Sequence, residues 1–170
     1  DGAAAVVVMS AQRARQLNVK GAVPILGFGQ GQTSWEVAQR VELTTTAAEK
    51  SAHTAFKMAG LTPKDIDVAQ LYDCFTIAPL MTLEAYGFCP RGKGGQFVQG
   101  GRIEMGGELP INTSGGLLSE TGMPGLQLVL EGVRQMRGQA VNQVKGARTC
   151  AISNQGGIMH THSTLILGQA

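Results

Sequence analysis

Short apolar runs alternate with amphipathic runs along this chain, and this alternation limits the available folds more than any other feature. A continuous apolar run such as residues 1–9 is typical of a strand that is buried on both faces. Residues 44–61 instead repeat small apolar side chains at helical spacing. Because runs of the two kinds follow one another in turn, the sequence predicts a layered α/β domain with a mixed sheet.

Each run predicts one element. The expected strands are residues 1–9, 22–31, 65–75, a short strand that starts at 111, 146–153 and 159–168. The expected helices are residues 10–21, 44–61, 78–88 and 124–138. The apolar residues that share helical spacing in the last helix are Leu126, Val129, Leu130, Val133 and Met136. The glycine-rich residues 89–110 predict a long irregular excursion. Only NQGG separates the last two strands, which favours an antiparallel hairpin.

The composition excludes several classes of partner. Charged residues make up 15% of the chain and the net charge is +2, which is too small to favour nucleic acid or an anionic membrane. Sparse charge on a globular chain indicates that a partner chain or domain covers part of the surface. No apolar run is long enough for a transmembrane helix.

The cysteines and glycines match no common cofactor motif. Cys74, Cys89 and Cys150 form no spaced framework, which favours reduced thiols in a cytoplasmic protein. Neither CxxC nor HExxH is present, so we expect no metal site. The glycines of residues 27–31 do not have the spacing of a dinucleotide-binding loop.

Four polar or glycine-containing stretches fall where predicted strands end or helices begin. They are YDCF at 72–75, NTSGG at 112–116, SETGM at 119–123 and SNQGG at 153–157. Because ligands of α/β sheets bind in the loops at strand ends, these stretches are the candidate site.

Taken in order, these stretches resemble the C-terminal half of a thiolase. The chain opens with DGAAA, as that half does, and YDCF, NTSGGLLSETGMPG and TCAISNQGG stand where thiolases carry NEAF, the stretch ending in GHP, and the final glycine-rich loop. SETGM, GVRQMRG and HSTLILG are more similar still to thiolase-like lipid-transfer proteins. These proteins are relatives of the sterol carrier protein X thiolases and include steroid side-chain aldolases.

The resemblance implies a layered α/β/α thiolase-like half with a mixed, mostly parallel five-stranded sheet. Residues 1–20 would be the end of the N-terminal thiolase half and a linker, and residues 21–170 the C-terminal domain. The substrate would be a coenzyme A thioester, and no cofactor would be needed. The expected partners are the missing N-terminal half, a second copy in a homodimer of the whole protein, and a small OB-fold protein.

The chain departs from the family at three positions. Met123 replaces the GHP histidine, Tyr72 replaces the NEAF asparagine, and Gly122 replaces the tyrosine of the lipid-transfer motif SEAYM. A thioether cannot carry a proton, so standard thiolase catalysis is not intact on this chain. The two-tyrosine aldolase arrangement is not intact either.

Four side chains are candidates for catalysis. Tyr72 is the proposed acid/base, because a phenol at a strand end can donate to an oxyanion or accept a proton. Asp73 either orients a partner or caps the following helix. His160 and His162 would alternate on one face of a strand, and His160, nearer the glycine loop, is the proposed supporting residue. Cys150 lies near the position of the family's last-loop cysteine.

Glycines and the altered turn are candidates for substrate binding. Gly115, Gly116, Gly156 and Gly157 would let main-chain amides approach a thioester oxygen, while serving equally as tight turns. Two further residues of the turn are expected to line the substrate, Gly122 and Met123.

The sequence leaves three functions open. The first is retro-aldol cleavage of a β-hydroxyacyl-CoA by an enzyme subunit. The second is thiolysis or acyl transfer on a β-ketoacyl-CoA, with Cys150 as acid/base and the nucleophile on the missing half. The third is a non-catalytic scaffold subunit of a heteromer.

Overall fold

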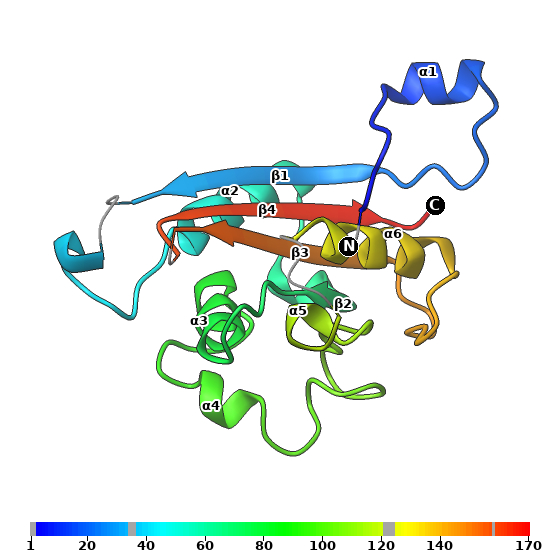
Figure 1. Ribbon diagram of the computed structural model, residues 1–170. Helices are drawn as coiled ribbons and strands as arrows, with labels where there is room; N and C mark the ends of the chain where they lie inside the picture. The colour runs from blue at the N-terminus through cyan, green and yellow to red at the C-terminus, as the bar shows by residue number, and fades with distance from the viewer. Residues whose placement is uncertain (1–2, 34–36, 121–124, 158) are drawn as a thin grey trace.

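A computed structural model describes residues 3–33, 37–120, 125–157 and 159–170. Its strands form one sheet with helices on both sides (Figure 1). The strands are β1 (Ile25–Gln32), β2 (Val68–Gln70), β3 (Thr149–Gly156) and β4 (Thr161–Gly168). The α-helices are α1 (Ala11–Gln16), α2 (Ala48–Ala59), α3 (Ile77–Tyr86), α4 (Gly94–Phe97), α5 (Gly116–Ser119) and α6 (Leu126–Arg137). Two short 3-10 helices are η1 (Val37–Gln39) and η2 (Pro63–Asp65).

The sheet is mixed, with the strand order β1-β4-β3-β2. β4 pairs antiparallel with both β1 and β3, and only the β2–β3 pair is parallel. The predicted final hairpin is therefore confirmed. The expected five strands, mostly parallel, are corrected to four strands that are mostly antiparallel.

The expected fifth strand at 111 survives only as an isolated bridge between Ile111 and Ala69. The chain turns away at the next residue, because Asn112 has a left-handed backbone with φ 48.

The N-terminal run does not form the strand that its apolar residues predict. Residues 3–9 have no regular structure, and Val7 and Val8 are 83% and 73% exposed. A strand needs a neighbouring strand to satisfy its main-chain groups, and none of the described residues lies beside this segment in the sheet. The helix that follows, α1, is capped by Ser10, contains no buried residue and stands away from the sheet (Figure 1).

Three alternate glycines explain how closely α2 packs on β1. A Cβ atom at Gly27, Gly29 or Gly31 would collide with a main-chain carbonyl of α2 or of its N-cap residue. The small residues on the facing side of α2 include Ala48, Ala52 and Ala55. The glycines of β1 therefore serve helix–strand packing.

The two faces of the sheet hold separate core clusters. On the side of α2 and α3, Ala69, Leu71, Ala151 and Ile166 are buried against residues of both helices. On the side of α6, Val68, Cys150, Ile152 and Leu167 pack with Leu128 and Met136.

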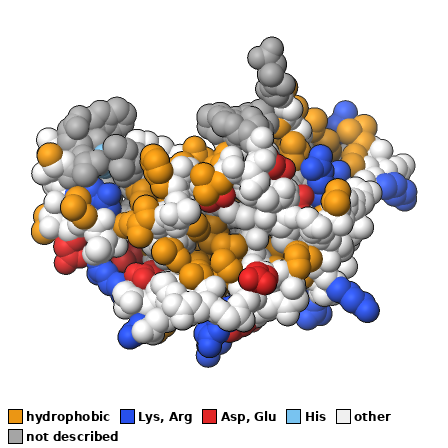
Figure 2. All heavy atoms as spheres, turned by 60° about the horizontal axis from the view of Figure 1, so that its bottom comes forward, with side chains coloured by type: hydrophobic (Ala, Val, Ile, Leu, Met, Phe, Trp, Pro, Cys, Tyr) orange, Lys and Arg blue, Asp and Glu red, His pale blue; other side chains and the backbone are white. Residues whose placement is uncertain are grey.

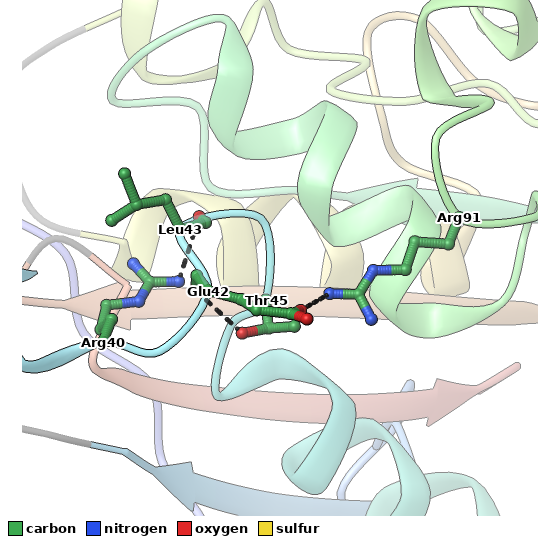
Figure 3. Close-up of polar contacts among 5 residues, drawn as sticks. All are labelled: Arg40, Glu42, Leu43, Thr45 and Arg91. Carbon is green, nitrogen blue, oxygen red and sulfur yellow. Dashed lines mark hydrogen bonds and ion pairs between the residues drawn. The ribbon is translucent and has the colours of Figure 1, made fainter.

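Residues 89–110 are mostly irregular, as predicted, and contain the short helix α4. An exposed ion pair joins the start of this excursion to the loop before α2 (Figure 3). The Arg91 guanidinium donates to Glu42 Oε2 at 2.6 Å, and Thr45 Oγ1 donates to the Glu42 carbonyl at 3.1 Å. Because the pair is exposed, we expect it to add less than about 1 kcal/mol to stability.

Candidate functional site

Three segments meet at the end of β2: the chain that leaves this strand, the loop from Asn112 to Leu117, and the end of β3. The Asn112 side chain joins the first two. Its Oδ1 accepts from Leu71 N at 2.7 Å, and its Nδ2 donates to the Leu71 carbonyl at 2.9 Å. A side-chain amide thus continues the pairing where the strand ladder stops.

Asp73 is buried and holds the same loop from the other side. Its Oδ1 accepts from Leu117 N at 2.7 Å, so it caps α5. Of the two roles that the sequence left open for Asp73, the cap on the following helix, α3, is not seen, because the bond that Asp73 makes among the described residues is to α5. The carboxylate also fills the space where a side chain at Gly116 would lie.

Tyr72 is half-buried and packs against the core cluster on the α6 side of the sheet. Its N–H donates to Ser153 Oγ of β3 at 2.9 Å. Burial raises the pKa of the Tyr72 phenol above its ordinary value, and Cys74 and Asp73 raise it further. The phenol therefore stays protonated at neutral pH, and its chemistry there is that of a hydrogen-bond or proton donor.

The end of β3 also contacts residues 72–75, which form the corner after β2, through Gln155. Its Nε2 donates to the Cys74 sulfur at 3.1 Å, while its Oε1 is buried without a hydrogen-bond partner. Sequence reasoning did not single out Gln155. Its place between two predicted strands, beside a glycine pair, was the available signal.

Cys150 does not lie in the final loop. It is fully buried inside β3, where it pairs with Val68 and Leu167. Burial raises the pKa of its thiol well above the ordinary value, and Glu131 adds to the shift. In this environment the thiol stays protonated, so the geometry does not support its expected acid/base role.

The two histidines are not neighbours on one face of a strand, because β4 begins only at Thr161. His160 lies in the preceding turn, where its N–H donates to the Gly157 carbonyl at 3.1 Å and its carbonyl accepts from Thr33 N at 2.8 Å. His160 is buried, and its Nδ1 has no hydrogen-bond partner among the described residues. Within the described part of the chain, no hydrogen bond joins His160 to Tyr72 or Asp73.

His162 lies inside β4 and is fully enclosed. Its Nδ1 is 2.9 Å from Ser51 Oγ of α2, and its Nε2 has no partner. Burial lowers the pKa of His162 to about 4, so the ring is neutral at physiological pH.

The candidate glycines fall into two turns. Gly115 and Gly116 have φ of 110 and 65 and lie beside the corner, but the Gly115 N–H already donates to the Asn112 carbonyl at 2.8 Å. Gly156 is the last residue of β3, and Gly157 lies in the turn before β4, next to His160. The other two candidates, Gly122 and Met123, lie outside the described residues.

A buried polar cluster beneath the loop was missed by sequence reasoning. Thr113 Oγ1 donates to Glu131 Oε1 at 2.5 Å and accepts from Gln70 and Gln135, each at 2.9 Å. Asn142 Nδ2 donates to the Thr113 carbonyl at 2.8 Å. These contacts fix the loop from below. The four-residue spacing of Glu131 and Gln135 on the predicted helix was the signal that could have revealed them.

The surface near α3, α4 and α5 is rich in apolar side chains. Figure 2 turns this side of the molecule towards the viewer and shows hydrophobic side chains gathered across its middle. Phe75 is 69% exposed directly after the corner, and Ile77 and Leu118 are also exposed. Such a surface suits an apolar ligand or a covering protein.

Within the described residues, no cluster of histidine, cysteine and acidic side chains has the arrangement of a metal site. No helix among them is both long and apolar enough to cross a bilayer.

Comparison with known proteins gives consistent matches. A family described as "thiolase C-terminal domain-like" matches residues 29–169 of this chain. A 17-hydroxy-3-oxo-4-pregnene-20-carboxyl-CoA lyase of Mycobacterium tuberculosis is 40% identical, over 99% of this chain and 44% of its own length. An acetyl-CoA acetyltransferase of Methanothermobacter thermautotrophicus is 37% identical, over 92% of this chain and 42% of its own length.

A solved structure titled Ltp2-ChsH2(DUF35) aldolase is also similar, with a TM-score of 0.81 and 36% identity over 86% of this chain and 39% of that chain. This chain thus spans less than half the length of the relatives that it matches.

Proposed function

This chain belongs to the thiolase C-terminal domain-like family, and on that basis we propose that it forms the C-terminal half of an enzyme that cleaves a carbon–carbon bond of an acyl-CoA. The proposed reaction is the retro-aldol cleavage of a β-hydroxyacyl-CoA, of the kind that releases a steroid side chain. The similar lyase and the similar aldolase structure support this choice.

The observation that carries the proposal is the position and protonation of Tyr72. In a retro-aldol step the β-hydroxyl loses its proton and becomes a carbonyl. The electron pair of the broken carbon–carbon bond moves onto the thioester as an enolate, which is then protonated. Tyr72 stays protonated where the three loops meet, and we assign it the role of donor to the enolate oxygen.

This assignment is narrower than the acid/base role expected from the sequence. A tyrosine base would need a neighbouring positive charge or a strong donor to lower its pKa. Burial and the neighbouring residues Cys74 and Asp73 instead raise the pKa of Tyr72. The thioester itself takes up the negative charge, so the proposed chemistry needs no cofactor.

We propose that an N-terminal half and a partner protein complete the enzyme. Residues 1–20 would join an N-terminal half to the domain of residues 21–170, which agrees with a family match that begins at residue 29. A small OB-fold partner is proposed as well, and the two-component title of the similar aldolase structure supports a heteromeric assembly.

Thiolysis is the second candidate, because one relative is an acetyl-CoA acetyltransferase. That reaction needs an acid/base cysteine, and the buried Cys150 is poorly suited to the role.

The test is an activity assay on the full-length protein that carries this chain, together with its OB-fold partner. The assay offers a β-hydroxyacyl-CoA alone and, separately, a β-ketoacyl-CoA with free CoA. We expect cleavage of the hydroxy substrate without free CoA. Cleavage of the keto substrate only, dependent on CoA, would establish thiolysis instead. An intact assembly that cleaves neither substrate would indicate a scaffold.

Tyr72→Phe should lower kcat for the hydroxy substrate by a factor of about 100 or more, because it removes the donor while keeping the ring. Thr76→Ala is the matched control, since this exposed residue near the corner makes no side-chain cap. A fully active Tyr72→Phe variant would disprove the assigned role.

A further inference from the structure

A continuous chain of buried polar side chains runs through the molecule and ends at the main chain of Tyr72. His162 Nδ1 is 2.9 Å from Ser51 Oγ, which is 2.8 Å from Thr164 Oγ1. Thr164 Oγ1 is 2.6 Å from the Tyr86 hydroxyl. Ser153 lies opposite Thr164 in the β3–β4 pairing, so its hydroxyl belongs to the same cluster and interacts with that of Tyr86. All five side chains are almost completely enclosed, and they come from α2, α3, β3 and β4.

The contacts are compatible with one direction of donation along this chain. In that direction Ser51 donates to the Ala48 carbonyl at 3.0 Å and accepts from both Thr164 and His162. Thr164, having donated to Ser51, accepts from the Tyr86 hydroxyl. Burial raises the pKa of Tyr86 far above its ordinary value, so its proton is present to be donated.

The same direction of donation continues to the main chain of Tyr72. Since Tyr86 donates to Thr164, it accepts from the Ser153 hydroxyl. Ser153 Oγ in turn accepts the Tyr72 N–H at 2.9 Å. The chain thus runs from a main-chain N–H at the corner to a main-chain carbonyl in α2, and each hydroxyl donates once.

The Tyr72 end lies where ordinary strand pairing has stopped. The last paired residues of β2 and β3 are Gln70 and Ile152. Beyond them a side-chain oxygen, Ser153 Oγ, takes the place of a main-chain acceptor for Tyr72. Tyr86 is buried and hydrogen-bonded to Thr164 beside Ser153, and so favours one orientation of the Ser153 hydroxyl.

We propose that Ser153 is a positioning residue, which the buried chain through Tyr86, Thr164 and Ser51 holds in the one rotamer that fixes the main chain of Tyr72. This inference rests on the proposed function of Tyr72 and extends it to residues that do not touch the substrate. In the direction of donation described above, His162 has the Nδ1–H tautomer.

The test compares three variants of the full-length protein. Ser153→Ala leaves the Tyr72 N–H without its acceptor. Tyr86→Phe keeps Ser153 but removes the group that orients it. Thr82→Val is the control, because its buried hydroxyl lies on the same helix and bonds only the Ala78 carbonyl, at 2.9 Å.

Two quantities are measured for each variant: kinetic constants with the hydroxy substrate, and amide hydrogen exchange of the segment 71–75. We expect Ser153→Ala to lower kcat about tenfold with little change in KM, as for the loss of one buried hydrogen bond. Exchange in 71–75 should become about tenfold faster. Tyr86→Phe should show the same two changes at smaller size, and Thr82→Val neither.

Unchanged exchange in folded Ser153→Ala would overturn the proposal, whatever the activity. If Ser153→Ala does not fold, unchanged exchange in Tyr86→Phe would overturn it in the same way. Faster exchange with full kcat, in a protein that Tyr72→Phe inactivates, would also overturn it. If Tyr72→Phe is itself fully active, the proposed function fails, while faster exchange would still support Ser153 as the anchor of the corner.

Discussion

At the scale of single residues, the corner depends on a glycine that leaves room for a carboxylate. Asp73 lies where a side chain at Gly116 would be, and Gly116 also has a left-handed backbone with φ 65. The Leu117 N–H can donate to Asp73 because glycine at position 116 has no side chain that would displace the carboxylate.

Gly116→Ala should therefore destabilise the protein by about 3 kcal/mol, from left-handed strain and the collision together. Gly100→Ala is the control, because Gly100 has φ 69 and open space around it. Gly100→Ala should lower the free energy of unfolding only by the backbone strain, about 1 kcal/mol. Urea denaturation measures both values. Equal losses in the two variants would show that the contact with Asp73 does not matter.

His162 should make the stability depend on pH. Its pKa is lowered from 6.5 to about 4, so the unfolded chain takes up a proton first as the pH falls. The contribution is complete above pH ~6.5 and is lost as the pH falls towards 4, with a total of about 3 kcal/mol.

Urea denaturation from pH 7 to pH 4 would measure this loss. His162→Gln should flatten the dependence in that window. His53→Gln, at an exposed position on α2, should leave it as it is. A slope that survives in His162→Gln would mean that other groups cause it.

At the scale of elements, α6 buries its polar side. Gln127, Glu131 and Gln135 are enclosed. The apolar residues Leu126, Val129, Leu130 and Val133 are only half-buried, and of the apolar positions singled out in the sequence Met136 alone is fully enclosed. Glu131 and Gln135 hydrogen-bond Thr113 of the loop, so the helix serves the site as much as the core.

Thr113→Val should cost about 2 to 3 kcal/mol, because the Glu131 carboxylate and two glutamine amides lose a buried partner. Thr54→Val is the control, since the Thr54 hydroxyl is exposed and bonds only a carbonyl of its own helix. It should change stability by less than about 0.5 kcal/mol. Thermal unfolding of the variants would measure both effects. A near-zero effect of Thr113→Val would contradict the role given to this cluster.

At the scale of the whole molecule, one side of the sheet is incompletely covered. Phe28 of β1 is 59% exposed and borders a depression that is also lined by Val129, Ile152 and Leu165. The half-buried apolar residues of α6 lie on the same side of the sheet. Since the relatives are more than twice as long as this chain, we expect the rest of the protein to cover this side.

Phe28→Asp should therefore destabilise the full-length protein by about 2 kcal/mol, the value of one buried aromatic side chain. In the 170-residue chain alone it should have little effect. Val141→Asp is the control, because Val141 is 96% exposed in a loop. Thermal unfolding of both lengths would measure the difference. An equal effect at both lengths would place the covering segment elsewhere.

Apart from the strand expected at 111, the sequence was sufficient to predict the order of the main helices and strands after the first run. It also predicted the final hairpin and the resemblance to thiolase-like proteins, which the family match confirms. These features depend on local patterns: a strand or a helix shows in the spacing of a few neighbouring residues. The location of YDCF directly after the strand β2 was predictable in the same way.

Only the tertiary structure decided the direction of the strands, the burial of Cys150 inside β3 and the partner of Asp73. It also decided that the glycines of β1 serve helix packing and that Ser153 anchors Tyr72. Each of these depends on residues far apart in the chain. Pairing between such residues is set by the packing of whole elements, which no local spacing of side chains records.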